Sequence, residues 1–276
     1  MLAELLRALL VQVVDGARLL VVDNDERESA RPVVGSFPGV EYIVESLPGV
    51  ASARNRALEE RLPHEAIAFI DDDEIPDPVW LPRLRDSLRV TGADAVGGPV
   101  VTVYAADVPR WVRRLGIHER AERPEGPTGH LATNNVIIAP SAFEKMDSPK
   151  FSLEFNATGG EDTEFFERLI AVGGRTHWCR GATVEEEVNA DRATIRWIFT
   201  RGVQTGTTTA RLALRSNSRW LIASKGIAQI GRGVLLVLVS LGAWRSLLRL
   251  GILDLSNGVG LLVGVSGRIT NYYGDM

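Results

Sequence analysis

A short apolar segment that ends in four consecutive acids constrains this chain more than any other feature. Residues 66–70 contain no polar side chain, and Asp71, Asp72, Asp73 and Glu74 follow them directly. A strand without apolar–polar alternation is predicted to be buried on both faces, as in a sheet covered by helices. Ligands of such sheets bind at the carboxyl ends of the strands, where these four acids, the acid run, are expected to lie.

The first two-thirds of the chain alternates short apolar segments with helical patterns. This order favours an α/β fold with a mostly parallel, Rossmann-like sheet that is flanked by helices. We predict strands over residues 18–22 and 42–44, helices over residues 1–12, 51–62, 78–90 and 160–172, and a helix that Asp191 caps and that runs to about residue 205.

Composition and charge exclude several classes of protein. The single cysteine, Cys179, excludes an internal disulfide framework and is expected to be a small core residue. Residues 201–276 contain nine Lys or Arg and two acidic residues, whereas residues 1–200 contain 22 basic and 33 acidic residues. A basic, apolar tail on an acidic body indicates attachment to anionic lipid. No zinc-ligand spacing or helix-turn-helix pattern indicates a nucleic-acid module.

The predicted tail, residues 211–276, contains two uncharged segments, Gly233–Trp244 and Leu255–Gly267. Each is shorter than the ~20 residues that a membrane-spanning helix requires. They are predicted to be interfacial or re-entrant helices, which would place the protein at the cytoplasmic face of the cytoplasmic membrane. The alternative is a pair of helices packed on the body that residues 1–210 are predicted to form.

The acid run is physically unfavourable unless a cation neutralises it, because neighbouring carboxylates repel one another. Asp71 and Asp73 form an Asp-x-Asp pair, whose oxygens could hold Mg²⁺ or Mn²⁺ while the ion binds a substrate diphosphate. The alternative interpretation is a solvated acidic loop.

A second acidic segment, Gly159-Gly160-Glu161-Asp162, opens the predicted helix over residues 160–172. The glycines would let the backbone approach a ligand, and the helix dipole would stabilise the acids. One of these carboxylates could act as a general base, although helix capping alone would also explain them. Asp23, which follows an apolar strand, could accept a hydrogen bond from a nucleobase or ribose.

Four motifs in this order resemble those of family 2 glycosyltransferases, which have the GT-A fold. They are Val21-Val22-Asp23-Asn24, Gly49 to Asn55, Phe69 to Asp73 and Gly159 to Asp162. Asp71 to Leu81 and Ala182 to Glu186 look most like bacterial succinoglycan-type exopolysaccharide β-glucosyltransferases. The resemblance covers about residues 1–206 and implies that residues 1–210 form the catalytic domain.

The resemblance implies a role for each residue of a candidate site. Asp162 would be the general base, and Glu161 would bind acceptor hydroxyls. The donor site would consist of Asp23 at the uracil or ribose, Arg54 near the nucleotide, and Asp71 and Asp72 at the diphosphate. Asp71 and Asp73 would hold Mn²⁺ or Mg²⁺, with Asp73 the direct ligand. Trp111, Asn134 and Asn135 would bind the acceptor.

Two departures from the family pattern qualify these expectations. Many relatives have a histidine where this chain has Glu186, so this chain does not match the family's third metal ligand. Family members also begin with a central strand, whereas this chain starts at the helix that normally follows it. We therefore expect either a start upstream of Met1 or an incomplete and inactive protein.

The implied reaction is transfer of a sugar, expected to be glucose, from a UDP-sugar to a glycan or polyprenyl-diphosphate-linked acceptor, with inversion at the anomeric carbon. Two alternatives stay open. Asp71 and Asp73 also resemble the nucleophile and acid–base pair of haloacid-dehalogenase phosphatases, which require a downstream lysine. A non-catalytic, membrane-attached nucleotide-sugar binder is the other alternative.

Overall fold

The computed structural model describes residues 1–13, 16–240 and 245–267, which form two compact units. The sheet unit contains Met1–Thr102, Arg120–Asn156 and Glu161–Glu187, and the helical unit contains Val103–Glu119, Ala157–Gly160 and Val188–Met276. The predicted boundary at residue 210 falls inside a helix of the helical unit, which also contains the described part of the predicted tail. Trp244 and residues 268–276 lie outside the described residues.

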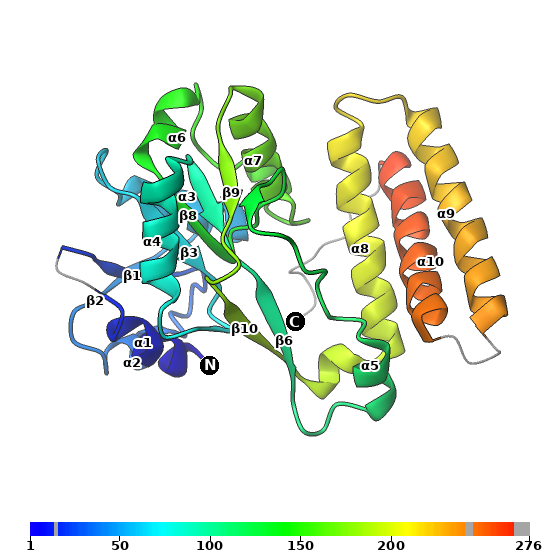
Figure 1. Cartoon of the computed structure of the whole chain (residues 1–276), viewed down its shortest axis with the longest axis horizontal. Coiled ribbons are helices and arrows are strands. Elements are labelled where there is room, and N and C mark those ends of the chain that lie inside the picture. Colours follow the sequence, from blue (N-terminus) through cyan, green and yellow to red (C-terminus); the bar gives the residue numbers. More distant parts are fainter. Residues whose placement is uncertain (14–15, 241–244, 268–276) are drawn as a thin grey trace. The chain divides into compact units, whose positions relative to one another are not determined.

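The strands form three sheets (Figure 1). Their bounds are β1 Leu19–Asp23, β2 Val40–Val44, β3 Ile67–Ile70, β4 Glu74–Pro76, β5 Ala95–Gly97, β6 Val100–Tyr104, β7 Gly126–Pro127, β8 Asn135–Ile138, β9 Thr176–Trp178 and β10 Val184–Val188. The largest sheet has the order β3-β8-β5-β9-β7, a second has the order β4-β10-β6, and β1 pairs with β2.

The α/β class is confirmed, but the main sheet is mixed rather than mostly parallel. Strand β5 is parallel to β9, as β1 is to β2, whereas β8 is antiparallel to both β3 and β5, and β7 is antiparallel to β9. Strand β3 stands at one end of the strand order, and its four residues are half-buried rather than buried on both faces. An end position explains this difference, because no described strand covers its outer edge.

Helices cover the sheets of the sheet unit. They are α1 Leu2–Leu10, α2 Arg31–Val34, α3 Val50–Glu59, α4 Trp80–Thr91, α6 Pro140–Lys145 and α7 Glu161–Ala171, with a 3-10 turn at Leu153–Phe155. One core cluster joins Phe151, Phe165 and Phe166 to Val136 and Ile138 of β8. A second joins Leu9 of α1 and Trp80 of α4 to Ile137, which points to the other face of β8. The sheet is thus held between α7 and α4.

The helical unit contains α5 Arg110–Leu115, α8 Ile195–Ala213, α9 Arg219–Ser240 and α10 Arg245–Val265, with a 3-10 turn at Ala190–Ala193. Helix α10 packs along both α8 and α9 (Figure 1). The prediction that Asp191 caps a helix is wrong: Thr194 caps α8, and its side chain accepts a hydrogen bond from the Trp197 N–H. The helix also extends eight residues beyond the predicted end.

The tail segments are longer than predicted. Helices α9 and α10 have 22 and 21 residues, and both are long and apolar enough to cross a membrane by length and composition. Counting uncharged residues alone underestimated them, because Lys225, Arg232 and Asp254 lie inside the helices without ending them. A charged side chain that is paired or exposed is compatible with a continuous helix.

Candidate active site

Arg54 joins the acid run to the second acidic segment. Its Nη1 forms an ion pair with Glu161 Oε1, and its Nη2 lies 3.4 Å from Asp71 Oδ1. The Arg54 side chain is only 11% exposed and that of Glu161 only 4%, so both charges are largely withdrawn from water. The structure therefore brings together three of the predicted site residues from α3, the end of β3 and the start of α7.

Three asparagine side chains hold α3, the helix that carries Arg54. Asn24 Oδ1 accepts a hydrogen bond from the Gly49 N–H, and Asn156 Oδ1 accepts one from the Ser52 N–H. Asn55 exchanges two hydrogen bonds with the backbone of Phe151. Gly49 precedes the helix with φ of 123°, and a side chain there would overlap Asn156. These contacts fix the helix on which the position of Arg54 depends.

Sequence reasoning missed the role of Asn156. It stands in an Asn-Ala-Thr sequence that resembles a glycosylation site, yet its amide also donates to Pro48 O and Ser52 Oγ. The partners lie more than 100 residues away in the chain. No local pattern could have indicated them, because the contact depends on how the loop before α7 packs against α3.

The first three acids of the run form the turn between β3 and β4, and Glu74 is the first residue of β4. Burial raises the pKa of Asp71, Arg54 lowers it, and the carboxylates of Asp73, Asp72 and Asp162 raise it. The side chain stays 46% exposed, so the repulsion among these carboxylates acts where ions from solvent can reach it. A cation bound among these oxygens would relieve that repulsion.

Glu74 differs from the other acids of the run because it is buried. It is 1% exposed, and its Oε1 accepts a hydrogen bond of 2.6 Å from Asn134 Nδ2. Burial and the nearby Asp71 carboxylate raise the pKa of Glu74 to about 9. Its Oε2 has no hydrogen-bond partner among the described residues. At neutral pH this carboxyl group is therefore protonated.

Glu161 and Asp162 differ in surroundings although they are adjacent in α7. Burial raises the pKa of Glu161 to about 7, against the effect of Arg54, while the Asp162 carboxylate raises it further. Asp162 is half-buried, and its Oδ1 accepts a hydrogen bond of 2.6 Å from the Thr163 N–H. Gly159 and Gly160 precede the helix with φ of 71° and 97°, conformations that favour glycine. Asp162 is thus the more accessible of the two carboxylates.

The carboxylate of Asp23 is already used within the protein. Its Oδ1 accepts a hydrogen bond from the Asp25 N–H, and its Oδ2 accepts from the Ala30 N–H and the Tyr42 hydroxyl. The residue is 6% exposed. These contacts shape the turn after β1, and the predicted contact of Asp23 with the nucleotide stays a prediction.

The predicted acceptor residues belong to two different units. Asn135 Oδ1 accepts a hydrogen bond from Trp80 Nε1, and its amide donates to the carbonyls of Pro99 and Ala182, so its polar atoms serve the interior. Asn134 binds Glu74. Trp111 lies on α5 of the helical unit and is 38% exposed. Their acceptor roles stay predictions.

The acid run fits a divalent cation that the protein and the phosphates of a bound substrate would hold together. No group of three potential metal ligands gathers in the described part of the chain. Asp71 and Asp73 supply carboxylate oxygens, and Mg²⁺ is commonly bound by one or two carboxylates together with substrate phosphates. Glu186, which stands where many relatives have a histidine, forms an ion pair of 2.7 Å with Arg120.

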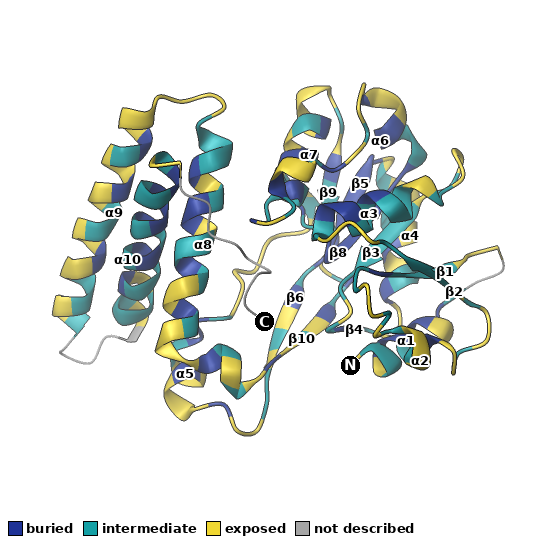
Figure 2. Cartoon of the chain, turned by 180° about the vertical axis from the view of Figure 1, so that it is seen from behind, coloured by how far each residue is buried: buried dark blue, intermediate teal, exposed yellow. Residues whose placement is uncertain are grey.

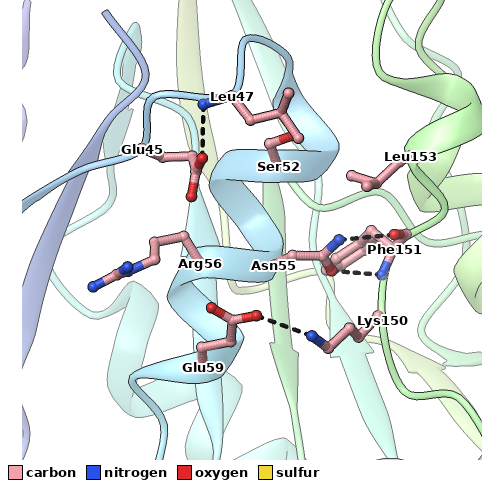
Figure 3. A pocket seen from close by; sticks show the side chains of 9 residues that line it. All are labelled: Glu45, Leu47, Ser52, Asn55, Arg56, Glu59, Lys150, Phe151 and Leu153. Carbon is pink, nitrogen blue, oxygen red and sulfur yellow. Dashed lines mark hydrogen bonds and ion pairs between the residues drawn. The ribbon is translucent and has the colours of Figure 1, made fainter. Parts of the chain in front are cut away.

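A hollow of about 240 Å³ lies beside α3, and neither Arg54 nor the acids of the site line it. Ser52, Asn55, Arg56 and Glu59 line it from the helix (Figure 3). Its charged groups are largely paired internally: Lys150 with Glu59, Arg56 with Glu60, and Glu45 with the Leu47 N–H. We assign it no ligand.

The chain is similar to one protein family and to two glycan-related proteins from other organisms. Residues 1–146 match the family described as "Glycosyl transferase family 2". The "Succinoglycan biosynthesis protein ExoM" of Rhizobium meliloti (strain 1021) is 34% identical over 240 residues, which cover 82% of this chain and 76% of that protein. The "Glycosyltransferase AglE" of Haloferax volcanii is 27% identical over 173 residues, which cover 60% of this chain and 50% of that protein.

Proposed function

Because this chain belongs to glycosyl transferase family 2, we propose that it transfers a hexose from a UDP-sugar to a hydroxyl of a glycan or lipid-linked oligosaccharide, with inversion at the anomeric carbon. The observation that carries the proposal is the bridge that Arg54 makes between Asp71 and Glu161. This bridge joins the acid run to the segment that contains a candidate base. The carboxylates of the acid run are suited to a metal ion that binds a diphosphate.

The donor side of the reaction requires compensation of negative charge. A Mn²⁺ or Mg²⁺ ion bound at Asp71 and Asp73 would supply Lewis-acid stabilisation of the leaving diphosphate. Asp72 lies between them on the exposed turn, and Arg54 adds a fixed positive charge whose position α3 maintains. Electrostatic stabilisation of this kind is usually the largest single contribution to catalysis.

The acceptor side requires a base. As the acceptor oxygen bonds to the anomeric carbon and the bond to the diphosphate breaks, the Asp162 carboxylate takes the hydroxyl proton. Glu161 is less suited to this step because one of its oxygens is held by Arg54. Glu161 instead maintains Arg54 in place. Its second oxygen is buried without a partner among the described residues, and its contact with an acceptor hydroxyl stays a prediction.

Replacing Asp162 tests the proposal directly. Asp162→Asn is expected to lower transfer by at least about 10²-fold, because general-base catalysis contributes roughly 10²–10⁴-fold. Calorimetric binding of UDP and Mn²⁺ should stay close to that of the wild type. The control is Glu167→Gln, an exposed acid on the same helix. Residual activity above a few per cent in Asp162→Asn would contradict the assignment.

One relative and two apolar helices support the choice of acceptor and of cellular location. The similarity to a succinoglycan biosynthesis protein favours cell-surface polysaccharide synthesis, with glucose as the transferred sugar. Helices α9 and α10 favour work at a membrane. We place this work at the cytoplasmic face, where polyprenyl-diphosphate-linked glycans would be accessible. Transfer assays with a panel of UDP-sugars and lipid-linked acceptors would identify both substrates.

The lysines do not favour the phosphatase alternative. Lys145 forms an ion pair of 2.6 Å with Asp94, and Lys150 pairs with Glu59. Lys225 lies on α9 of the helical unit. We expect no hydrolysis of a generic aryl phosphate, and UDP binding without turnover would instead support the non-catalytic binder.

A further inference from the structure

Helix α9 exposes an apolar stripe along its whole length. Trp220, Ile227, Val234 and Leu238 repeat at helical spacing and are between 45% and 86% exposed, with the small residues Ser224 and Gly231 between them. Leu235 and Val239 widen the stripe and are 60% and 55% exposed. At about 1.5 Å per residue, the 22 residues of α9 form an apolar surface roughly 33 Å long. This surface, the outer face of α9, has no partner among the described residues.

Helix α10 has no comparable face, because it is enclosed on two sides. No residue of α10 from Gly251 to Val265 is exposed (Figure 2). A side chain at Gly206 of α8 would overlap Asn257 O, and one at Gly233 of α9 would lie 2.8 Å from the Leu255 N. The backbones of α8, α9 and α10 are therefore in close contact through glycine.

This packing makes a membrane-spanning hairpin unfavourable. If α9 and α10 crossed a bilayer, α8 would have to enter it as well or separate from α10. Helix α8 presents Arg201, Gln204, Thr205 and Thr209, side chains that are costly in hydrocarbon. The ion pair of Arg232 with Asp254, near the middle of both helices, would also have to lie at the centre of the bilayer. A helix that lies along the surface avoids these costs.

The charge of the helices indicates which surface α9 meets. Residues 195–265 contain nine Lys or Arg and one acid, Asp254. That acid is buried against Arg232, so it does not offset the charge of the other basic residues. Lys225 borders the outer face of α9 and is exposed. A second copy of this chain would present the same positive charge and be repelled, whereas anionic headgroups would be attracted.

We propose that α9 lies in the plane of an anionic membrane surface, with its outer face in the boundary between headgroups and acyl chains, and that α10 does not span the bilayer. The inference rests on the proposed work at a membrane but not on the sugar-transfer chemistry. Trp220, at the start of α9, would sit at headgroup level as interfacial tryptophans do.

Vesicle binding by the full-length protein tests the surface. Leu235→Glu with Leu238→Glu should weaken binding to phosphatidylcholine–phosphatidylglycerol vesicles by at least about tenfold, because two apolar side chains lose their burial. The matched control is Val90→Glu with Val172→Glu, two exposed valines of the sheet unit, which should bind like the wild type. Equal binding by both double variants would overturn the proposal.

The orientation is tested with single cysteines at the two ends of α9. In sealed vesicles, a membrane-impermeant maleimide should label Asn217→Cys and Ser240→Cys equally before detergent is added. Protection of either position until detergent is added would show a spanning helix and overturn the proposal. The wild type serves as the blank, since Cys179 is buried.

Two measurements separate this proposal from its rivals. The first is the oligomeric state on vesicles. If the wild type is a dimer there and the double variant Leu235→Glu with Leu238→Glu is a monomer, the outer face of α9 binds a second copy and the proposal is overturned. Asp162→Asn should bind vesicles normally, and the double variant should retain transfer to a soluble acceptor. Failure of the catalytic proposal and failure of the lipid proposal therefore give different results.

Discussion

At the scale of single residues, the candidate site depends on buried charges whose partners differ. Arg54 and Glu161 compensate each other, with 11% and 4% of their side chains exposed. Glu74 has a neutral partner, Asn134, and avoids an uncompensated charge by keeping its proton. Replacing Arg54, the partner of a buried acid, should therefore lower the free energy of unfolding, whereas replacing the buried acid Glu74 should raise it.

Replacing Arg54 should be costly. Arg54→Gln leaves Glu161 buried without its cation, and breaking a buried pair in this way costs about 3–5 kcal/mol of unfolding free energy. The control is Arg56→Gln, which removes a partly exposed i,i+4 pair with Glu60 and should cost less than about 1 kcal/mol. Denaturant unfolding of the metal-free protein measures both values. Equal effects of the two substitutions would contradict the role of Arg54.

Replacing Glu74 should increase stability at neutral and alkaline pH. The pKa of Glu74 is raised from 4.5 to about 9 in the folded protein, so the folded state binds a proton that the unfolded state releases. Its contribution to stability is therefore greatest below pH ~4.5 and declines as pH rises toward ~9. Glu74→Gln should raise the unfolding free energy by about 1–3 kcal/mol at pH 8 and have little effect at pH 4.5.

Thermal unfolding at several pH values, without divalent cations, measures this dependence. The control is Glu144→Gln, an exposed acid on α6. If Glu74→Gln lowers the melting temperature equally at every pH, the lost carboxyl group was stabilising and the assigned direction is wrong.

At the scale of elements, α10 is held by glycines in both neighbouring helices. Gly206 and Gly260 meet between α8 and α10, and Gly226 and Gly258 meet between α9 and α10. Glycine is unfavourable in an isolated helix, so its repeated use here is explained by the close approach of the backbones. The same glycines leave the larger apolar side chains of α9 on its outer face.

A pair of glycine substitutions separates packing from helix propensity. Gly206→Ala would place a methyl group against Asn257 O and should lower stability by about 1–3 kcal/mol. Gly231→Ala on α9 meets nothing within 4 Å and should stabilise the helix by roughly 0.5–1 kcal/mol. Circular dichroism at 222 nm during thermal unfolding measures both. A stabilising Gly206→Ala would show that α8 and α10 are not in close contact.

At the scale of the whole molecule, the region proposed for sugar transfer is acidic and the region proposed for membrane binding is basic. Residues 1–200 carry the excess of acids, including those of the candidate metal site, and residues 201–276 carry the excess of bases. An acidic catalytic region would be repelled by anionic lipid, whereas the basic helices would be attracted to it.

Membrane binding should therefore depend partly on salt. Raising the sodium chloride concentration from about 0.05 to 0.5 M should weaken binding to anionic vesicles several-fold, because the Debye length falls from more than 10 Å to about 4 Å. Binding should not disappear, since the apolar contribution of α9 is insensitive to screening. Complete release by salt would show that the outer face of α9 does not enter the lipid.

The sequence by itself determined the class of fold, the family and the positions of the principal motifs. Apolar segments and helical periodicity are local properties, so β1, β3, α3 and α7 lie where they were predicted within a few residues. The order of the motifs was sufficient to indicate family 2, and the family match confirms it. The predicted roles of the site residues stay predictions.

Only the tertiary structure decided which charges are paired. Arg54 and Glu161 are 107 positions apart, and no local pattern specifies that they meet. Packing likewise assigned Asn156 to the start of α3, committed Asp23 and Asn135 to internal hydrogen bonds, and enclosed α10 while leaving α9 exposed. Periodicity reports which residues are apolar, whereas the choice of partner depends on the close packing of segments that are distant in the chain.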